Sequence, residues 1–413
     1  MEEVRWFVGI DWGATHHQVC VLDEKRKEVE NKSVAHDGAA MSALVERLMI
    51  LAEGKSERLA VGIETRWNAI VDTLLERGIR VYCINPKQLD RFRDRHTMAG
   101  AKDDRRDAFV IAESLCTDAA AYREIKLGDP RLLELRELAH MHDELGQEHR
   151  AVASRLYQQV LRIFPQLLEL GSIHTDEWLV SLLDRAPTPE EAKRLSLAKI
   201  GTILKAHGIR KWTAEQVREL LQKPAVYVAD GVTRAAQTHM RMLLPRLKLI
   251  NEQRHETRKA IEGLLDELEK PSDDANRIEH RDVTILRSLP GVGMYVAATM
   301  LSEAREALEQ RDYHQLRGLV GVAPVTRQSG KSHKVMMRKA CSRRLRTAVF
   351  FLAKTIVRYD DRLQALYKTH RARGHSQGHA LRVVGDRALA MLMAMLQAGT
   401  EYDPSKRTVR LAA

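Results

Sequence analysis

The chain contains 413 residues, with 67 Lys and Arg against 56 Asp and Glu and a formal net charge of +11. Its length predicts two or three domains with a substantial core, and the basic excess favours nucleic acid as a partner because Lys and Arg neutralise phosphates. No apolar run reaches the roughly 20 residues of a membrane span. Residues 1–5 do not resemble a signal peptide, so we expect a cytoplasmic protein with no membrane partner.

Cysteine and histidine usage argues against a zinc-binding domain. The cysteines are isolated, none forms a Cys-x-x-Cys pair, and we expect no histidine cluster with the spacing of a zinc site. Reduced structural thiols are therefore expected at all four cysteines, namely Cys20, Cys83, Cys116 and Cys341.

The first 125 residues alternate strand-like and helix-like segments. Three strands in a meander, followed by helix, strand, helix and strand, is the order of an α/β domain of the ribonuclease-H-like, or RuvC-like, class. The predicted strands are 5–11, 17–22, 27–34, 58–64 and 79–83, and the predicted helices are 39–53, 67–77, 86–95 and 104–117.

Two of the predicted strands end in an acid. Asp11 follows the apolar run 6–10, and Glu64 follows the apolar run 59–63. A strand that ends in this way delivers its carboxylate to the edge of a sheet.

Two further acids begin the predicted helix 104–117. Asp104 and Asp107 lie three residues apart and so share one helical face. Taken singly, each acid is an ordinary solvated charge, and a helix N-terminus favours acids through its dipole. As an ordered set, Asp11, Glu64 and this pair match the oxygen ligands that Mg²⁺ prefers. Two Mg²⁺ ions held in this way can clamp the attacking and leaving oxygens of a phosphoryl displacement.

The pattern changes after residue 129 to two long helices with apolar positions three and four residues apart. They could pair as a coiled-coil hairpin or across subunits, and an ordinary amphipathic bundle is an equally good interpretation. Between them, segment 171–235 has helix-start signals at 187–191 and 212–215, which predict a small helical insertion. The periodic positions are Leu135, Leu138, His142, Leu145, His149, Val152, Leu156, Gln159 and Ile163, and Leu243, Leu247, Ile250, Arg254, Thr257, Ile261, Leu264 and Leu268.

A third region follows the polar break at 271–274. Residues 286–293, which contain Pro290 and Gly291, are typical of a helix-hairpin-helix element that presents backbone N–H groups to a DNA phosphate. A Pro-Gly turn between packed helices explains the same residues equally well.

The stretch 325–346 contains no Asp or Glu and predicts a surface that binds a nucleic-acid backbone. A run of this kind is also often a solvated face. Ser329, beside Gly330, lies within it, and a serine in a cationic field near a metal or base can attack phosphorus. By itself, Ser-Gly is only a turn. The basic residues are Arg327, Lys331, Lys334, Arg338, Lys339, Arg343, Arg344 and Arg346.

With these motifs in order, the chain resembles the insertion-sequence 110 family of transposases, to which the pilin-gene inverting recombinases are related. That family combines an N-terminal Asp-Glu-Asp-Asp tetrad with a C-terminal Pro-Gly-x-Gly segment and a Gly-x-x-Pro motif that leads to Ser-Gly. The matching segments are 9–11, 62–64, 102–108, 289–293 and 321–330.

The resemblance implies an RNA-guided DNA recombinase of an insertion sequence. Asp11, Glu64, Asp104 and Asp107 would hold Mg²⁺, and Ser329 would form a covalent phosphoserine. The implied partners are donor DNA, target DNA, a structured noncoding guide (bridge) RNA and further copies of the chain, as a dimer or tetramer, in a prokaryotic, nucleoid-associated setting.

The resemblance also divides the chain. It implies a RuvC-like catalytic domain over 1–125, a coiled-coil or helical linker over 126–275, a mainly α-helical transposase domain over 276–400 and a tail over 401–413. Asp103 stands where the family more usually has a small polar residue.

Three other functions use some of these features. A RuvC-like hydrolase of branched DNA would use the tetrad with water as its nucleophile and would not need Ser329. A site-specific DNA invertase would act without guide RNA. A noncatalytic nucleic-acid scaffold would use the basic stretch and leave the acids without a role.

Overall fold

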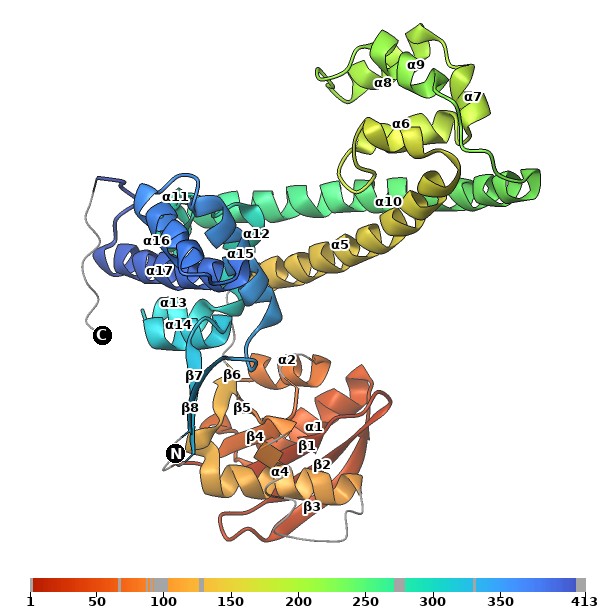
Figure 1. Cartoon of the computed structure of the whole chain (residues 1–413). Coiled ribbons are helices and arrows are strands. Elements are labelled where there is room, and N and C mark those ends of the chain that lie inside the picture. Colours follow the sequence, from red (N-terminus) through yellow and green to blue (C-terminus); the bar gives the residue numbers. More distant parts are fainter. Residues whose placement is uncertain are drawn as a thin grey trace. The chain divides into compact units, whose positions relative to one another are not determined.

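The protein comprises two compact units, an N-terminal unit of Met1–Asp129 and a C-terminal unit of Pro130–Ala413, as seen in a computed structural model (Figure 1). None of the described helices is both long enough and apolar enough to cross a membrane. The predicted helix 86–95 falls largely outside the described residues. The structure describes residues 3–65, 68–86, 88–89, 92, 103–125, 130–270, 279–329 and 332–405.

The N-terminal unit is built on a mixed six-stranded sheet with the order β3-β2-β1-β4-β5-β6. The first three strands form an antiparallel meander, β1, β4 and β5 are parallel, and β6 is antiparallel to β5. All five predicted strands are confirmed to within one or two residues, and β6 was not predicted. The strands are β1 Trp6–Asp11, β2 His16–Leu22, β3 Glu28–Ala35, β4 Leu59–Ile63, β5 Arg80–Cys83 and β6 Arg123–Ile125.

Helices pack against both faces of this sheet (Figure 1). Side chains alternate between the faces of a strand, so Val8 and Ile10 face one core with α1 and α2, while Phe7 faces the other with α4. The helices are α1 Gly38–Leu51, η1 Ser56–Arg58, α2 Ala69–Glu76, α4 Asp104–Asp118 and η2 Ala119–Ala121.

Two long helices begin the C-terminal unit, α5 (Pro130–Ile163) and α10 (Asp230–Glu269). They run antiparallel, because the start of α5 shares a core with the end of α10 and the end of α5 shares a second core with the start of α10. Most of the predicted apolar positions are buried, including Leu156 and Leu247. The helices therefore pair within the chain, and a coiled-coil supercoil stays a prediction.

The segment between the long helices is a helical insertion, as predicted, and it packs on them through its own core (Figure 1). Thr188 caps α7 with Pro189 in its first turn, and Thr213 forms a capping box with Gln216 at α9, so both predicted helix starts are confirmed. The elements are η3 Pro165–Glu169, α6 Glu177–Arg185, α7 Pro189–Lys193, α8 Leu197–Ala206 and α9 Ala214–Gln222.

The remaining helices pack around one large core together with the start of α5 and the end of α10. A two-stranded hairpin projects from this helical region (Figure 1). The mainly helical character predicted for this region is confirmed. The elements are α11 Glu279–Ser288, α12 Met294–Glu303, α13 Arg305–Glu309, α14 Tyr313–Val320, β7 Pro324–Ser329, β8 Ser332–Met337, α15 Arg343–Ile356, α16 Asp361–Ala372 and α17 Gln377–Ala398.

Candidate active-site residues

Two glycines let α4 lie directly on the sheet. A Cβ atom on Gly9 of β1 would stand 2.0 Å from the Ala108 carbonyl oxygen and 2.5 Å from the Ala112 nitrogen. A Cβ atom on Gly62 of β4 would stand 2.9 Å from the Cγ2 of Ile111. A side chain at Gly9 would push the backbone of the helix away from the strands, and one at Gly62 would crowd the side chains of Ile111 and Ile84.

These glycines fix the face on which the first two acids lie. Gly9 and Gly62 are register partners on parallel strands, and Asp11 and Glu64 each come two residues later. Side chains two residues apart point to the same face, about 6.6 Å further along the strand. The two carboxylates therefore lie side by side at the C-terminal ends of β1 and β4, on the sheet face covered by α4.

The other two acids lie in the first turn of α4. Asp107 directly precedes Ala108, the residue that meets Gly9, and its side chain is only 3% exposed. Asp104 lies one turn earlier and is exposed. The structure thus brings Asp107 to the sheet face that also bears Asp11 and Glu64. Because burying a carboxylate is costly unless hydrogen bonds or a cation compensate, the donor set fits a hard divalent cation such as Mg²⁺.

The acid that precedes the tetrad helix has a local role. Asp103 is the N-cap of α4, and its carboxylate accepts a hydrogen bond from the Arg105 backbone N–H at 3.2 Å. A capping carboxylate satisfies an amide that would otherwise lack a partner at the helix start. This geometry accounts for an acid at position 103 without assigning it to a metal.

A polar network missed by the sequence interpretation ties the same helix turn to β2 and β3. Asn31 donates through Nδ2 to the Arg105 carbonyl oxygen at 3.2 Å and to Glu28 at 3.0 Å. Gln18, the register partner of Asp11, donates to the Asn31 side-chain oxygen at 2.7 Å. Gln18 stands at the polar start of β2, beside His16 and His17, and this local pattern does not single it out.

The cysteines behave as predicted, since all four are free thiols. Burial raises the pKa of Cys20 and of Cys116 to about 12. Both thiols therefore stay protonated at neutral pH and act as packing groups rather than nucleophiles.

The Pro-Gly segment forms the turn between α11 and α12. Gly291 has a φ of +95°, which favours glycine. A Cβ atom there would lie 3.1 Å from the Leu352 carbonyl oxygen of α15. An open depression of about 510 Å³ borders this turn and is also lined by Arg287 and Tyr359. Two helices joined by a tight turn are thus present and packed against α15, which fits both interpretations, and contact of a helix-hairpin-helix element with DNA stays a prediction.

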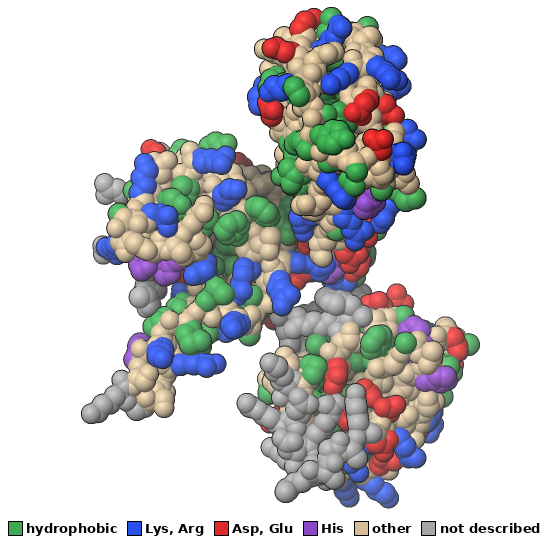
Figure 2. Space-filling model, turned by 45° about the vertical axis from the view of Figure 1, so that its right-hand side comes forward, with side chains coloured by type: hydrophobic (Ala, Val, Ile, Leu, Met, Phe, Trp, Pro, Cys, Tyr) green, Lys and Arg blue, Asp and Glu red, His purple; other side chains and the backbone are tan. Residues whose placement is uncertain are grey.

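Ser329 is the last residue of β7 and pairs with Ser332 of β8. Both are exposed, as is nearly all of the hairpin, including Val335 at 61%. Cross-strand partners share a face, so the alternation puts Arg327 and Lys334, themselves partners, on the same face as the two serines. In Figure 2, basic and hydrophobic side chains lie beside one another on this projection.

The other basic residues of the stretch differ in their surroundings. Arg344 pairs with Asp143 at 3.2 Å and lies 3.7 Å from Glu303, and Arg346 donates to the Arg338 carbonyl oxygen. Lys331 lies outside the described residues. The exposed members are Arg327, Lys334, Lys339 and Arg343.

One prediction was wrong, because a histidine cluster with metal-ligand spacing is present. His370, His375 and His379 lie together in the C-terminal unit, with ring nitrogens within 4.8 Å of one another. Four residues separate His370 from His375 and three separate His375 from His379, and this spacing was the signal in the sequence. The spacing differs from the familiar zinc-finger patterns, so it did not predict a metal site.

Two family models match the chain. One, described as "Transposase" and labelled for the DEDD type of IS110, matches residues 8–165, and the other, described as "Transposase IS116/IS110/IS902 family", matches residues 283–368. The first range includes all four acids, and the second includes both the Pro-Gly turn and Ser329.

Curated relatives agree with these matches. The chain is 40% identical over 209 residues to "Putative transposase y4uE" of Sinorhizobium fredii, which spans 50% of this chain and 58% of that protein. It is 29% identical to "Mini-circle putative transposase for IS117" of Streptomyces coelicolor, over 97% of this chain and 96% of the relative. A Streptomyces coelicolor protein of insertion element IS110 is 25% identical over the same shares. The chain therefore belongs to the IS110 family of insertion-sequence transposases, which are enzymes that act on DNA.

Proposed function

We propose that the chain is an RNA-guided recombinase that cleaves and rejoins DNA through four carboxylates and a serine nucleophile. The observation that carries the proposal is that the buried Asp107, on the first turn of α4, lies against the sheet face of Asp11 and Glu64, where α4 closely contacts Gly9. Acids gathered where a tightly packed helix meets the end of two strands fit phosphodiester chemistry better than scattered surface charges do.

Asp11, Glu64, Asp104 and Asp107 are the residues that would hold Mg²⁺. When bound, the metal would supply positive charge at the attacking and leaving oxygens of the phosphoryl group. The protein's contribution is rigidity, because the β1–β4 register and the first turn of α4 fix the carboxylates before DNA arrives.

The hairpin would supply the nucleophile. The Ser329 hydroxyl would lose its proton and attack a DNA phosphorus, forming a Ser–O–P bond while the bond from phosphorus to one sugar oxygen breaks and that oxygen takes up a proton. Arg327 and Lys334 share the Ser329 face and would offset the charge that grows on the phosphoryl oxygens. His333 pairs with Gln328 on the opposite face and is therefore poorly placed to act as the base.

The remaining parts of the proposal are the guide RNA and the oligomer. A net charge of +11 supports binding to nucleic acid. We expect the protein purified without nuclease to carry RNA that it shields from added nuclease. RNA-free protein that still recombines its own element ends would show that the protein reads the DNA directly.

A covalent adduct tests the proposed chemistry. With Mg²⁺ and DNA carrying its element ends, the protein should form a protein–DNA species that survives denaturation, and Ser329→Ala should lose it. Ser332→Ala, a change on the opposite strand of the same hairpin, is the matched control and should retain the adduct. An adduct that persists in Ser329→Ala and disappears in Ser332→Ala would move the nucleophile to Ser332, whereas cleavage without any adduct would favour a RuvC-like hydrolase.

A further inference from the structure

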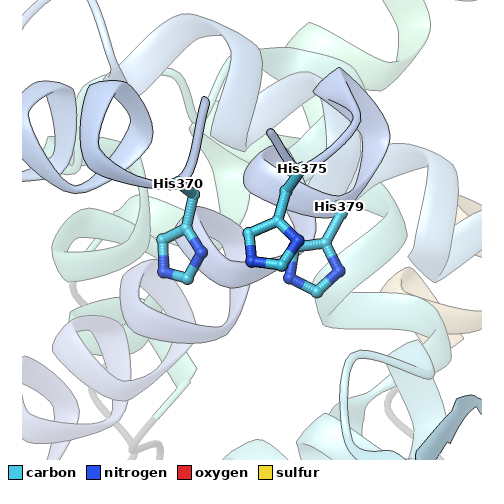
Figure 3. Close-up of side chains that lie close together, drawn as sticks. All are labelled: His370, His375 and His379. Atoms are coloured by element: carbon cyan, nitrogen blue, oxygen red, sulfur yellow. The ribbon is translucent and has the colours of Figure 1, made fainter. Parts of the chain in front are cut away.

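Three histidines meet where α16 ends and α17 begins. His370 lies in the last turn of α16, His375 lies in the connecting loop, and His379 lies in the first turn of α17. Their rings lie side by side (Figure 3), and each ring offers a nitrogen within 4.8 Å of a nitrogen on the other two.

The connecting turn holds these residues in place. Gly374 has a φ of +82°, which lets the chain reverse at the end of α16. The His375 backbone N–H donates to the His370 carbonyl oxygen at 3.3 Å, and Arg371 donates to the His375 carbonyl oxygen at 2.6 Å. The backbone of this turn therefore holds the three histidine residues close together.

One of the three rings has a buried nitrogen that needs a partner. The Nδ1 atom of His370 is buried and has no hydrogen-bond partner among the described residues. Buried polar atoms are normally satisfied, so this nitrogen calls for a ligand or a water. His375 and His379 are stacked, with centroids 4.3 Å apart and planes 22° apart, so the His375 ring has to rotate before both rings can bind one ion.

We propose that His370, His375 and His379 form a zinc site that links α16 to α17. Zinc takes imidazole nitrogens at 2.0–2.1 Å in tetrahedral geometry, which corresponds to ligand nitrogens about 3.3 Å apart. Rotation of the exposed His375 ring and small shifts of the other two would close the present separation of up to 4.8 Å. Water would take the fourth position.

The ligand type separates this site from the acids of the N-terminal unit. Imidazole suits zinc, copper and nickel, whereas Mg²⁺ prefers oxygen ligands. The nearby Arg371 and Arg382 repel cations, so the affinity should be lower than that of a buried structural zinc site. Because both helices pack into the large C-terminal core, the bound ion would stabilise that core at the α16–α17 turn.

Zinc titration of the full chain tests the proposal. After removal of metal by a chelator, Zn²⁺ alone is added in the presence of millimolar Mg²⁺, which occupies carboxylate sites. The unmodified chain should take up one more equivalent of Zn²⁺ than His375→Ala or His379→Ala. His239→Ala, which changes an exposed histidine on α10, is the matched control and should bind as the unmodified chain does, as should Asp11→Ala.

Two further measurements identify the ligands. X-ray absorption at the zinc edge should show imidazole nitrogens at about 2.0–2.1 Å. Trypsin cleavage after Arg371, in the last turn of α16, and after Arg373, its C-cap, should slow when Zn²⁺ is present and should be unaffected by Zn²⁺ in His375→Ala, since both arginines are exposed. Equal zinc uptake by the unmodified chain and both histidine variants, or a ligand shell of oxygens alone, would overturn the proposal.

Discussion

The two regions proposed to carry the chemistry differ in how they are built. In the N-terminal unit, Asp11 and Glu64 stand at the ends of strands with buried neighbours, and Asp104 and Asp107 stand on the helix that leaves no room for a Cβ at Gly9. Ser329 stands on a hairpin that is exposed along almost its whole length. Packing thus fixes the acids, whereas the serine is free to meet its substrate. Changes near the acids should cost stability, and changes on the hairpin should cost only function.

The largest effect should come from removing one acid. Asp11→Ala should abolish DNA cleavage because it removes a proposed metal ligand, while nucleic-acid binding through Lys and Arg stays nearly unchanged. Cleavage assays in Mg²⁺ and binding assays at matched salt separate the two effects.

Mixing variants sharpens this result. Asp11→Ala and Ser329→Ala should each be inactive alone, yet mixed oligomers should regain part of the cleavage if the acids of one subunit serve the serine of another. Asp11→Ala mixed with Glu64→Ala is the control and should stay inactive. No recovery in verified mixed oligomers would place both parts of the site in one subunit, and normal cleavage by Asp11→Ala would remove the acids from the mechanism.

A change beneath the helix tests whether packing positions the acids. Gly9→Ala puts a Cβ 2.0 Å from the Ala108 carbonyl oxygen. The helix must shift, which we expect to lower the free energy of unfolding by about 1–3 kcal/mol or more and to reduce cleavage at temperatures where the protein stays folded. Thermal unfolding and cleavage assays measure the two effects.

Gly38→Ala is the matched control, because a Cβ at Gly38 meets nothing within 4 Å. It should leave both stability and activity nearly unchanged. A Gly9→Ala protein as stable and active as the Gly38→Ala protein would show that the close approach of α4 does not position the acids.

The sequence could predict the sheet because each strand carries its own local pattern of apolar residues between turns. It also predicted which acids begin or end these elements. It did not reveal the Asn31 network, because hydrogen bonds between residues 74 positions apart leave no local signal. Nor could the basic stretch show that Arg344 is held by Asp143 of α5, far away in the sequence.

The Asn31 network gives a smaller test of the same comparison. Asn31→Ala removes the hydrogen bonds to the Arg105 carbonyl oxygen and to Glu28, so we expect a loss of about 1–2 kcal/mol in stability. Cleavage should fall because the first turn of α4, which bears Asp104 and Asp107, is less firmly held. Unfolding and single-turnover cleavage measure these changes.

Lys32→Ala is the control on the same strand. It removes only a partly exposed ion pair with Glu30, which is worth at most about 1 kcal/mol, and it should not affect cleavage. If Asn31→Ala and Lys32→Ala cleave at the same rate, the network has no positioning role.

The smallest effect should come from the cations of the hairpin. Arg327 and Lys334 are exposed register partners, so replacing either by Ala should leave thermal unfolding unchanged. If each contacts one phosphate, the slope of log affinity against log salt should fall by about 1 per cation removed. Lys199→Ala, on the insertion helix α8, changes the net charge equally and should leave the slope unaltered. A slope that responds equally to all three changes would mean that the hairpin contributes only overall charge, whereas a change confined to Arg327 and Lys334 would place the DNA backbone along the face that bears Ser329.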